Sequence, residues 1–354
     1  MDHLAPAEFA PETTYLNTAA LGLPPARALA ALRGDLDLWG AGRANAQSYD
    51  LPVAEARAAF GRLVGATPDR VAIGSTVSPL VATVAEALPE SGEVLLAEGE
   101  FTSVTQPFHS RRGLSVRTVP LERLAESISV WTRLVAVSTV QSADGRLADI
   151  TELRAATRHN GVRLLLDATQ SASWQPLEAT GADYVVCAAY KWLMSPRGSA
   201  FLAVSPEAAD TLRPLAPGWY AGDDPWANCY DRVRFPESAR RLDTAPAWLP
   251  FVGTAAALSL VEELTPARIG AHNLALADRF RKGLAGLGAV PVEAPGSAIV
   301  AVPGLGGAAA ALTEAGVVVS ARAGNLRTSF HLYNTAADVD LALEVLSRTP
   351  MDRP

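Results

Sequence analysis

The sequence predicts an α/β protein with a doubly wound, mainly parallel sheet and a smaller α+β domain towards the C-terminal end. Two observations lead to this prediction. Over residues 71–204, short β-branched runs alternate with longer amphipathic stretches, which is typical of a parallel sheet covered by helices. Further along the chain, two long helical patterns precede a second set of short strand and helix patterns. We therefore expect an N-terminal segment over residues 1–14, a large domain over 15–248 and a small domain over 249–354.

The elements of the large domain follow from the spacing of apolar residues. In the expected helices these residues recur at three- and four-residue steps, and the expected strands are short apolar runs rich in β-branched residues. The expected strands are 71–73, 93–96, 115–119, 134–138, 163–166, 183–187 and 199–204, and the expected helices are 79–88, 104–112 and 150–160. The pattern then loosens into a Pro-, Gly- and Trp-rich stretch over residues 214–248, which is too long for a simple connection and is typical of a functional loop.

The small domain begins with two long helical patterns, over residues 250–264 and 269–287. Pro266 ends the first pattern and Gly288 ends the second. The patterns that follow predict strands over 298–302, 317–320 and 327–331 and helices over 307–315 and 336–348. Strands and helices thus mix in this part of the chain, as in an α+β domain.

Composition excludes several classes of function. Of the 354 residues, 49% are hydrophobic and 19% are charged, which provides enough apolar material for a large buried core. The net charge of -7 leaves no excess of Lys and Arg for a nucleic acid or an anionic membrane surface, so we expect neither as a partner. No apolar run reaches the length of a membrane span, and the first residues lack the basic-then-apolar order of a signal peptide. We therefore expect a cytoplasmic protein.

Metal binding is also not expected. The chain contains two cysteines, Cys187 and Cys229, which are too few for a disulfide framework or a thiolate metal cage. Its five histidines show no paired ligand spacing. The sequence therefore predicts no metal site.

Two side chains at the ends of neighbouring predicted strands carry the strongest functional indication. Asp167 ends the run RLLLD, and Lys191 follows the run VVCAA. In an open parallel sheet ligands bind beyond the carboxyl ends of the strands, so we expect both side chains to face one crevice. A pyridoxal ring acts as an electron sink when a carboxylate keeps its nitrogen protonated, and a partly desolvated lysine holds its aldehyde. Taken singly, Asp167 as a helix cap and Lys191 as a surface lysine are the alternatives.

The segment that contains these residues resembles a known family. Asp167-Ala-Thr-Gln, Tyr-Lys191-Trp and Pro-Arg-Gly198 are similar to the class V aminotransferase-like branch of the fold-type I pyridoxal-phosphate enzymes, which includes cysteine desulfurases, kynureninases and ergothioneine-pathway C–S lyases. The likeness extends from about residue 15 to the last helix. It implies pyridoxal 5′-phosphate as the cofactor, an amino acid as the small-molecule substrate, and a homodimer with sites at its interface.

The resemblance implies roles for four residues of this segment. By likeness to the family, Asp167 meets the pyridine nitrogen, Gln170 meets the phenolic oxygen, and Lys191 forms the Schiff base with the cofactor. Tyr190 stands where many relatives have a histidine that contacts the phosphate, and it is expected to bind the cofactor. These four residues form the centre of the predicted site.

Five further positions match cofactor contacts of the family. Ser75 and Thr76 lie between a predicted strand and helix, where amides and hydroxyls form a phosphate cradle, and a simple helix cap is the alternative. Phe101 matches the aromatic residue that stacks on the pyridine ring, and core packing is the alternative. Ser142 occupies the place of a family Asn near the ring oxygen. Thr244 lies near a phosphate contact that relatives take from the partner subunit.

Three residues are expected to bind the substrate. Asn17, in YLNTAALG, is similar to the N-terminal segment that closes over the substrate carboxylate, and a turn asparagine is the alternative. Arg327 aligns with the arginine that clamps the α-carboxylate, a task that suits its forked guanidinium, and a surface ion pair is the alternative. Arg322 is the next candidate for a substrate anion.

The type of reaction stays open between transamination and C–S β-elimination, with cysteine desulfurase-like activity or epimerisation as alternatives. Cysteine desulfurases of the family carry a nucleophilic Cys shortly before the carboxylate-binding Arg, and the stretch SARAGNLR contains none, which disfavours desulfuration. Lys191 is then the expected base for the substrate α-proton. An inactive relative that binds partners is a further alternative, and the retention of Asp167, Gln170 and Lys191 speaks against it.

One more motif indicates a different class of protein. Gly304-Leu-Gly306-Gly307 follows the predicted strand 298–302, and Arg322 follows the next strand, as in the dinucleotide-binding unit of an oxidoreductase. About 50 residues remain after this motif, which is too few for the six-stranded domain that it needs. A dinucleotide-binding oxidoreductase is therefore a remote alternative.

Overall fold

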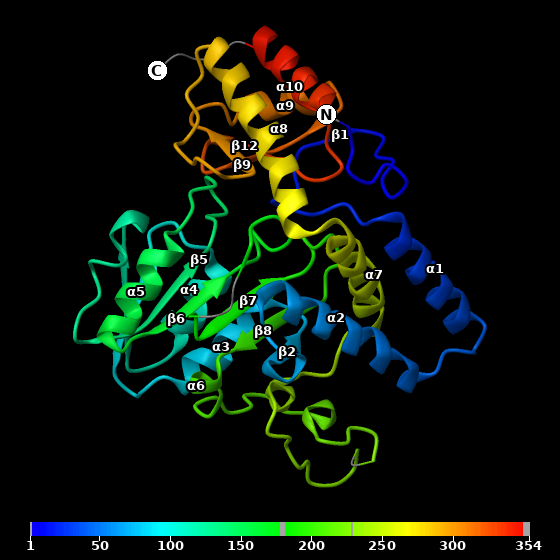
Figure 1. Cartoon of the computed structure of the whole chain (residues 1–354), viewed down its shortest axis with the longest axis vertical. Helices are drawn as coiled ribbons and strands as arrows, with labels where there is room; N and C mark the ends of the chain where they lie inside the picture. The colour runs from blue at the N-terminus through cyan, green and yellow to red at the C-terminus, as the bar shows by residue number, and fades with distance from the viewer. Residues whose placement is uncertain (1, 178–180, 228, 350–354) are drawn as a thin grey trace.

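A seven-stranded sheet forms the centre of the larger part of the molecule (Figure 1). The structure is a computed structural model, and it describes residues 2–177, 181–227 and 229–349. From one edge to the other, the strands are β2 (Val71–Gly74), β8 (Ala200–Val204), β7 (Tyr184–Ala188), β6 (Arg163–Asp167), β5 (Thr132–Ser138), β3 (Gly92–Ala97) and β4 (Leu114–Val119). β8 runs antiparallel to both of its neighbours, and the other neighbouring pairs are parallel. The predicted doubly wound, mainly parallel sheet is therefore confirmed.

Helices cover both faces of this sheet, which explains why its strands are apolar on both sides. The helices of this part are α1 (Ala26–Gly40), α2 (Asp50–Val64), α3 (Val77–Ala87), α4 (Thr102–Ser110), α5 (Ile150–Asn160), α6 (Pro206–Ala209) and α7 (Trp248–Leu264). α3, α4 and α6 pack with one set of strand side chains, which includes Leu134 and Ala136 of β5. α2 and α5 pack with the alternate set, which includes Val135 and Val137. The two-residue period of each strand thus divides the core into two layers.

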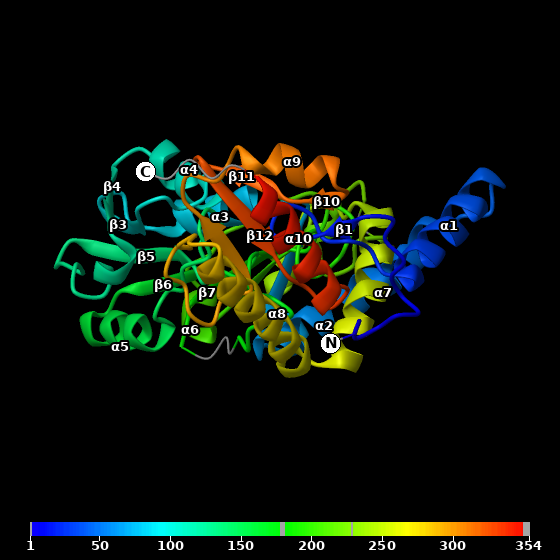
Figure 2. The same cartoon turned by 90° about the horizontal axis from the view of Figure 1, so that it is seen from above.

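Helices α1 and α2 were not predicted. α7 packs against both of them, and in Figure 2 α1 projects to one side of the molecule. Its apolar residues do not form a buried stripe: Ala28 is its one buried residue, and Trp39 is 64% exposed. Leu29, Leu32, Leu36 and Trp39 nevertheless recur at three- and four-residue steps, so the sequence contains a helical pattern here that the prediction missed.

A second, smaller sheet lies in the C-terminal part of the chain, at the top of Figure 1. The elements here are α8 (Pro266–Gly286), β9 (Ile299–Val302), α9 (Ala308–Glu314), β10 (Val317–Val318), β11 (Ser320–Arg322), β12 (Asn325–Ser329) and α10 (Ala336–Arg348). β11, β12 and β9 form an antiparallel sheet in that order, and β10 pairs in parallel with β1 (Thr14–Tyr15). The remote dinucleotide-binding alternative is therefore wrong, because β9 and β10 have different partners and the Gly304 motif between them is not part of a parallel βαβ unit.

The N-terminal segment joins the two parts of the molecule. The Leu4 N–H donates to the Leu332 carbonyl at 3.0 Å, and Asn17 pairs with Ser329 in a parallel bridge. The expected domain boundaries after residues 14 and 248 stay a prediction, and residues 350–354 of the expected small domain lie outside the described residues. Across the described ranges, no helix combines the length and the hydropathy needed to cross a membrane.

A buried ion pair fixes the edge of the large sheet at β2. Arg57 of α2 donates to both carboxylate oxygens of Asp243, at 3.1 and 2.6 Å. The Ile73 N–H donates to the same carboxylate at 2.9 Å, and the Thr244 N–H donates to the Ile73 carbonyl at 3.4 Å. The chain between the long loop and α7 is therefore held beside β2.

Candidate active site

Lys191 and Asp167 lie in one pocket at the carboxyl ends of the parallel strands. Asp167 is the last residue of β6, and Lys191 follows β7, which is its neighbour in the sheet. Both side chains are buried. The pocket is lined by Thr76, Val77, Phe101, Ser103, Ser138, Ser142, Asp167, Thr169, Gln170, Ala188, Tyr190, Lys191 and Arg197. The structure thus brings together seven of the residues that the sequence selected and adds several that it did not.

A tight turn presents Lys191 to this pocket. The Met194 N–H donates to the Lys191 carbonyl at 3.0 Å, and Met194 adopts a left-handed backbone with φ of 56°. Gly22 of the N-terminal segment lies against the same carbonyl, and a Cβ atom added to it would be 1.9 Å from the carbonyl oxygen. The Gly22 N–H donates to the Tyr190 carbonyl at 3.0 Å. Any side chain at position 22 would therefore displace the turn that carries the lysine.

Burial raises the pKa of the Asp167 carboxyl to about 6. The hydroxyl and the N–H of Thr169 bind the carboxylate, the N–H at 2.8 Å, and they oppose this shift, while repulsion from Glu100 adds to it. Within the described ranges, Asp167 forms no ion pair. A cationic group bound beside the carboxylate would relieve the cost of its burial.

Burial also lowers the pKa of the Lys191 amine, to about 8, and the positive charge of Arg327 adds to this shift while Asp167 opposes it. Lys191 Nζ lies 5.2 Å from the centre of the Phe101 ring and 5.7 Å from the centre of the Tyr190 ring. Phe101 is 45% exposed, so its ring offers a free face to a ligand. The neutral form of this amine, which is the nucleophilic form, is therefore much more populated near pH 7 than that of an ordinary lysine.

Three hydrogen bonds orient the Gln170 amide. Its Oε1 accepts from Trp192 Nε1 at 2.7 Å, and its Nε2 donates to the Ala19 carbonyl at 3.0 Å and to Ser142 Oγ at 2.9 Å. Because an indole N–H donates and does not accept, Trp192 determines which end of the amide points towards Ser142. Both residues predicted to lie near the ring oxygen, Gln170 and Ser142, are thus hydrogen bonded to each other.

His331 contacts the lysine turn from the C-terminal part of the chain. Its Nε2 lies 3.1 Å from the Trp192 carbonyl oxygen, and its Nδ1 lies 3.2 Å from Asn273 Nδ2. Burial lowers the pKa of His331 to about 3, so the ring is neutral, and the carbonyl requires the proton on Nε2. No local pattern indicates this role in the sequence, because His331 has no motif of its own.

Arg327 reaches the pocket from β12 and is 2% exposed. Its Nε donates to Ser320 Oγ at 3.2 Å, and its Nη1 donates to the Ser142 carbonyl and, at 3.2 Å, to Ser142 Oγ. Burial and the nearby charge of Arg322 lower the pKa of Arg327 to about 10. Its partners among the described residues are neutral oxygens, so the guanidinium has no counter-ion there.

The pocket also contains groups that suit an anion. Thr76 precedes α3 and its side chain makes no capping bond, which leaves the first N–H groups of the helix available. The Arg197 guanidinium stacks on the Tyr190 ring, with its central carbon 5.3 Å from the ring centre. Arg197 and Ser103 were not predicted as site residues, although Arg197 belongs to the Pro-Arg-Gly198 motif.

Five predicted site residues lie outside the lining of this pocket, and one of them, Arg327, contacts Ser142 of the lining. Ser75 and Thr244 line an adjacent hollow. Asn17 Oδ1 is buried and has no hydrogen-bond partner among the described residues, and Arg322 is exposed at the end of β11. Their predicted roles stay predictions.

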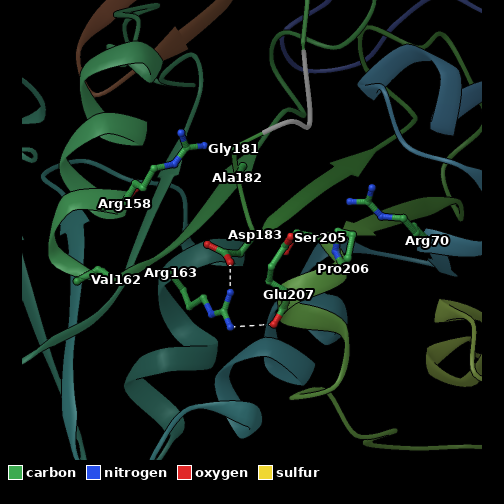
Figure 3. A pocket seen from close by; sticks show the side chains of 12 residues that line it. Arg70, Arg158, Val162, Arg163, Gly181, Ala182, Asp183, Ser205, Pro206 and Glu207 are labelled. Carbon is green, nitrogen blue, oxygen red and sulfur yellow. Dashed lines mark hydrogen bonds and ion pairs between the residues drawn. The ribbon is translucent and has the colours of Figure 1, made fainter.

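A larger hollow lies at the other end of the strands from Lys191. Figure 3 shows the side chains that line it. It is lined by residues at the amino ends of β6 and β7 and by Ser205, which follows the antiparallel β8. Arg163 pairs there with Asp183 and donates to the Glu207 carbonyl at 2.9 Å. This hollow is a weaker candidate for the active site, because Arg163 and Asp183 neutralise each other and it lies away from the carboxyl ends of the strands.

Comparison with known proteins agrees with this geometry. Residues 42–342 match the family model described as Aminotransferase class-V. The chain belongs to the class V aminotransferase family. An uncharacterized aminotransferase of Bacillus subtilis, YcbU, is 30% identical to this class V chain over 309 residues, which cover 82% of each protein. Isopenicillin N epimerase of Streptomyces clavuligerus is 28% identical over 255 residues, which cover 65% of this chain and 64% of that protein.

Solved structures show the same fold as this class V chain. The cystine C-S lyase C-DES, in complex with its reaction product cysteine persulfide, matches with a TM-score of 0.86 and 22% identity over 95% of this chain and 98% of its own. The apo cysteine desulfurase from Thermococcus onnurineus matches with a TM-score of 0.83 and 23% identity over 95% and 94% of the two chains. The resemblance to the class V family that the motifs predicted is therefore confirmed.

The pocket of this class V chain fits a pyridoxal-phosphate group. The buried Asp167 carboxylate suits a protonated ring nitrogen, and the Lys191 amine suits an aldehyde. The free face of Phe101 suits an aromatic ring. The amides at the start of α3, together with Arg197, suit a phosphate. In a further structure of C-DES, of a variant with 21% identity to this chain and a TM-score of 0.87, glycine is covalently linked to the PLP cofactor of that enzyme.

Proposed function

We propose that the chain is a pyridoxal-phosphate-dependent enzyme that acts on an amino acid, either by transamination or by C–S β-elimination. One observation carries the proposal: a buried carboxylate, Asp167, and a buried amine, Lys191, end two adjacent strands in one pocket. Membership of the class V family supports it. The bound cofactor supplies an electron sink for the electrons of the substrate α-carbon.

In this proposal each side chain has a separate task. Lys191 would hold the cofactor through its amine, and as a free amine it would remove the α-proton of the substrate. Asp167 keeps the ring nitrogen protonated. Gln170 and Ser142 would contact the ring oxygen, and Arg327 would bind the α-carboxylate through a guanidinium that has no other counter-ion in the described part of the chain.

Cysteine desulfuration has less support than these two reactions. Cys187 is 0% exposed in β7, and burial raises the pKa of its thiol well above the ordinary value. Cys229 is exposed in the long loop between β8 and α7, and the hairpin of β11 and β12 contains no cysteine. The buried Cys187 thiol is thus not suited to the nucleophilic task, and Cys229 could take part only if the long loop folded over the pocket.

Epimerisation is the alternative that one relative supports. The Streptomyces clavuligerus protein named isopenicillin N epimerase is 28% identical over 65% of this chain. An epimerase needs the same α-proton removal, followed by return of a proton to the other face of the α-carbon. It would therefore use the same lysine and the same arginine.

The composition allows a direct test of the covalent link. The chain contains two lysines, Lys191 in the pocket and Lys282 exposed on α8. The holoprotein should show visible absorbance, and borohydride should attach the cofactor irreversibly to the peptide that contains Lys191. Lys191→Ala should abolish both the attachment and turnover, whereas Lys282→Ala should leave both intact. Attachment to Lys282, or full activity in Lys191→Ala, would overturn the proposal.

Product analysis separates the reactions. Incubation with cysteine S-conjugates should yield pyruvate and a thiol if the enzyme is a C–S lyase. Transamination should instead convert the cofactor to its amine form and release a keto acid. Loss of α-deuterium with inversion and no net product would indicate an epimerase.

We also propose that the protein is a cytoplasmic homodimer. Exposed apolar side chains of α1 and α2 support the dimer, since Trp39 is 64% exposed and Leu51 is 65% exposed. Equilibrium sedimentation should give twice the mass of one chain. In the Trp39→Glu variant the measured mass should fall towards that of the monomer.

A further inference from the structure

We propose that Arg322 binds a second acidic group of the substrate, so that the enzyme acts on amino acids with an acidic side chain. This inference rests on the proposed function and names the substrate class of the same pocket. It depends on the position of two arginines in one hairpin, on their lack of acidic partners, and on the charge balance around Lys191.

The hairpin of β11 and β12 places Arg322 and Arg327 on one face. Ser320 pairs with Arg327 and Arg322 pairs with Asn325 in the antiparallel register. Side chains of paired residues, and of residues two apart on a strand, point to the same side of a sheet. The hydrogen bond from Arg327 Nε to Ser320 Oγ agrees with this arrangement. Arg322 therefore lies diagonally across from Arg327 on the same face, at a Cα spacing of roughly 7–8 Å for such a pair.

This face is directed towards the lysine. Arg327 donates to Ser142, which lines the pocket, and the charges of both Arg327 and Arg322 act on Lys191. Arg322 also acts on Arg327. Two guanidinium groups on one face of this hairpin suit the two acid groups of an amino acid with a short acidic side chain.

Both arginines lack an acidic partner in the part of the chain that the structure describes. Elsewhere in the C-terminal part, Arg279, Arg281 and Arg348 each form an ion pair with an acidic residue. The hydrogen bonds of Arg322 and Arg327 instead end on hydroxyl or carbonyl oxygens. Two like charges close together repel each other unless an anion lies between or beside them. A substrate with one carboxylate would satisfy Arg327 and leave Arg322 without a counter-ion.

Simple carboxylates provide a test that does not depend on turnover. Glutarate and succinate carry two carboxylates and no amine, so they cannot react with the cofactor, and butyrate carries one carboxylate. We would measure their dissociation constants for the holoenzyme by calorimetry. The variants are Arg322→Gln, Arg327→Gln and, as a control on the same part of the chain, Arg348→Gln.

The expected result is a preference of roughly tenfold or more for a dicarboxylate over butyrate in the wild type. Arg322→Gln should remove this preference and leave butyrate binding unchanged. Arg327→Gln should weaken both kinds of ligand, and Arg348→Gln should change neither. Equal binding of butyrate and the dicarboxylates by the wild type would overturn the proposal, as would a preference that survives in Arg322→Gln.

The same variants test the substrate itself. Aspartate, glutamate or cysteine sulfinate should be better substrates than asparagine, glutamine or alanine, and Arg322→Gln should raise KM for the acidic amino acids alone. If only neutral amino acids react, the inference about Arg322 fails while the proposed function stands. If the protein does not bind the cofactor, the proposed function itself fails.

Discussion

The indole N–H of Trp192 donates to Oε1 of Gln170 at 2.7 Å, and Trp192 follows Lys191 directly in the chain. The turn that carries the lysine therefore also orients the amide that faces Ser142. His331 contacts the carbonyl of the same Trp192, so the C-terminal part of the chain contributes to this orientation. The position of one lysine and the orientation of one amide thus depend on a single tryptophan.

Replacing this tryptophan should affect the Gln170 amide before it affects the fold. Trp192→Phe leaves Oε1 of Gln170 without a donor in a buried site, which costs on the order of 1–3 kcal/mol in the free energy of unfolding. We also expect a shift in the visible absorbance of the holoprotein, because the amide can then turn. Urea unfolding and absorbance spectra would measure the two effects. Trp131→Phe is the matched control, since Trp131 is 69% exposed, and an unchanged spectrum in Trp192→Phe would contradict the expected coupling.

The buried Asp167 should make the cofactor-free protein less stable as the pH rises. Its pKa is 3.8 in the unfolded reference and about 6 in the folded protein, so the folded state binds this proton more tightly. The free energy of unfolding should therefore fall as the pH rises between these two values. At pH 7, Asp167→Asn should stabilise the cofactor-free protein by about 1–3 kcal/mol and weaken cofactor binding.

Urea unfolding of the cofactor-free protein at several pH values measures this effect. The surface variant Asp69→Asn, which replaces an exposed carboxylate, should show no gain. A cofactor-free Asp167→Asn protein that is less stable than the wild type at pH 7 would show that the carboxylate has a stabilising partner in the empty pocket.

The ion pair between Arg57 and Asp243 should matter far more than a neighbouring surface pair. Its side chains are 6% and 0% exposed, so Asp243→Asn leaves a buried guanidinium without its counter-ion, and we expect a cost of about 3–5 kcal/mol in the free energy of unfolding. Arg62, on the same helix, pairs with Glu262 at exposures of 62% and 37%. Glu262→Gln should therefore cost about 0–1 kcal/mol. Equal effects of the two substitutions in urea unfolding would refute this assignment.

Thiol chemistry should not be needed for turnover. Cys229 is exposed and should react with a maleimide in the native protein, whereas Cys187 should react after unfolding. The double variant Cys187→Ala, Cys229→Ser should keep the wild-type rate with an amino-acid substrate and should form no persulfide. Loss of turnover in Cys229→Ser alone would instead show that Cys229, in the long loop, takes part in the reaction.

The sequence predicted the central sheet because its strands are short, apolar on both sides and separated by amphipathic helices. It did not predict α1, whose apolar residues Leu36, Leu38 and Trp39 face solvent and form no buried stripe. One strand of the small domain lies two residues earlier than predicted: the sequence predicted a strand over 327–331, and the observed strand β12 is Asn325–Ser329. His331 instead lies beyond the strand, where it contacts Trp192.

In the candidate site, residues of a compact motif were easier to predict than those joined only by the fold. Asp167 and Lys191 end adjacent strands, which the order of the sheet brings together. Glu100 and His331 act through contacts with residues far away in the chain, and no local pattern marks them. Arg197 was within a recognised motif, but its stacking on Tyr190 depends on how the chain turns after the lysine.

The close approach of Gly22 to Lys191 has a consequence for the order in which the chain folds. Residues 14–22 bond to residues 316–329 as well as to the lysine turn, so their partners are up to about 300 positions later in the sequence. During synthesis these early residues must wait until residues 316–329 have left the ribosome. We therefore expect nascent chains that stop before β12 to fold their central sheet while the lysine turn is still unsupported.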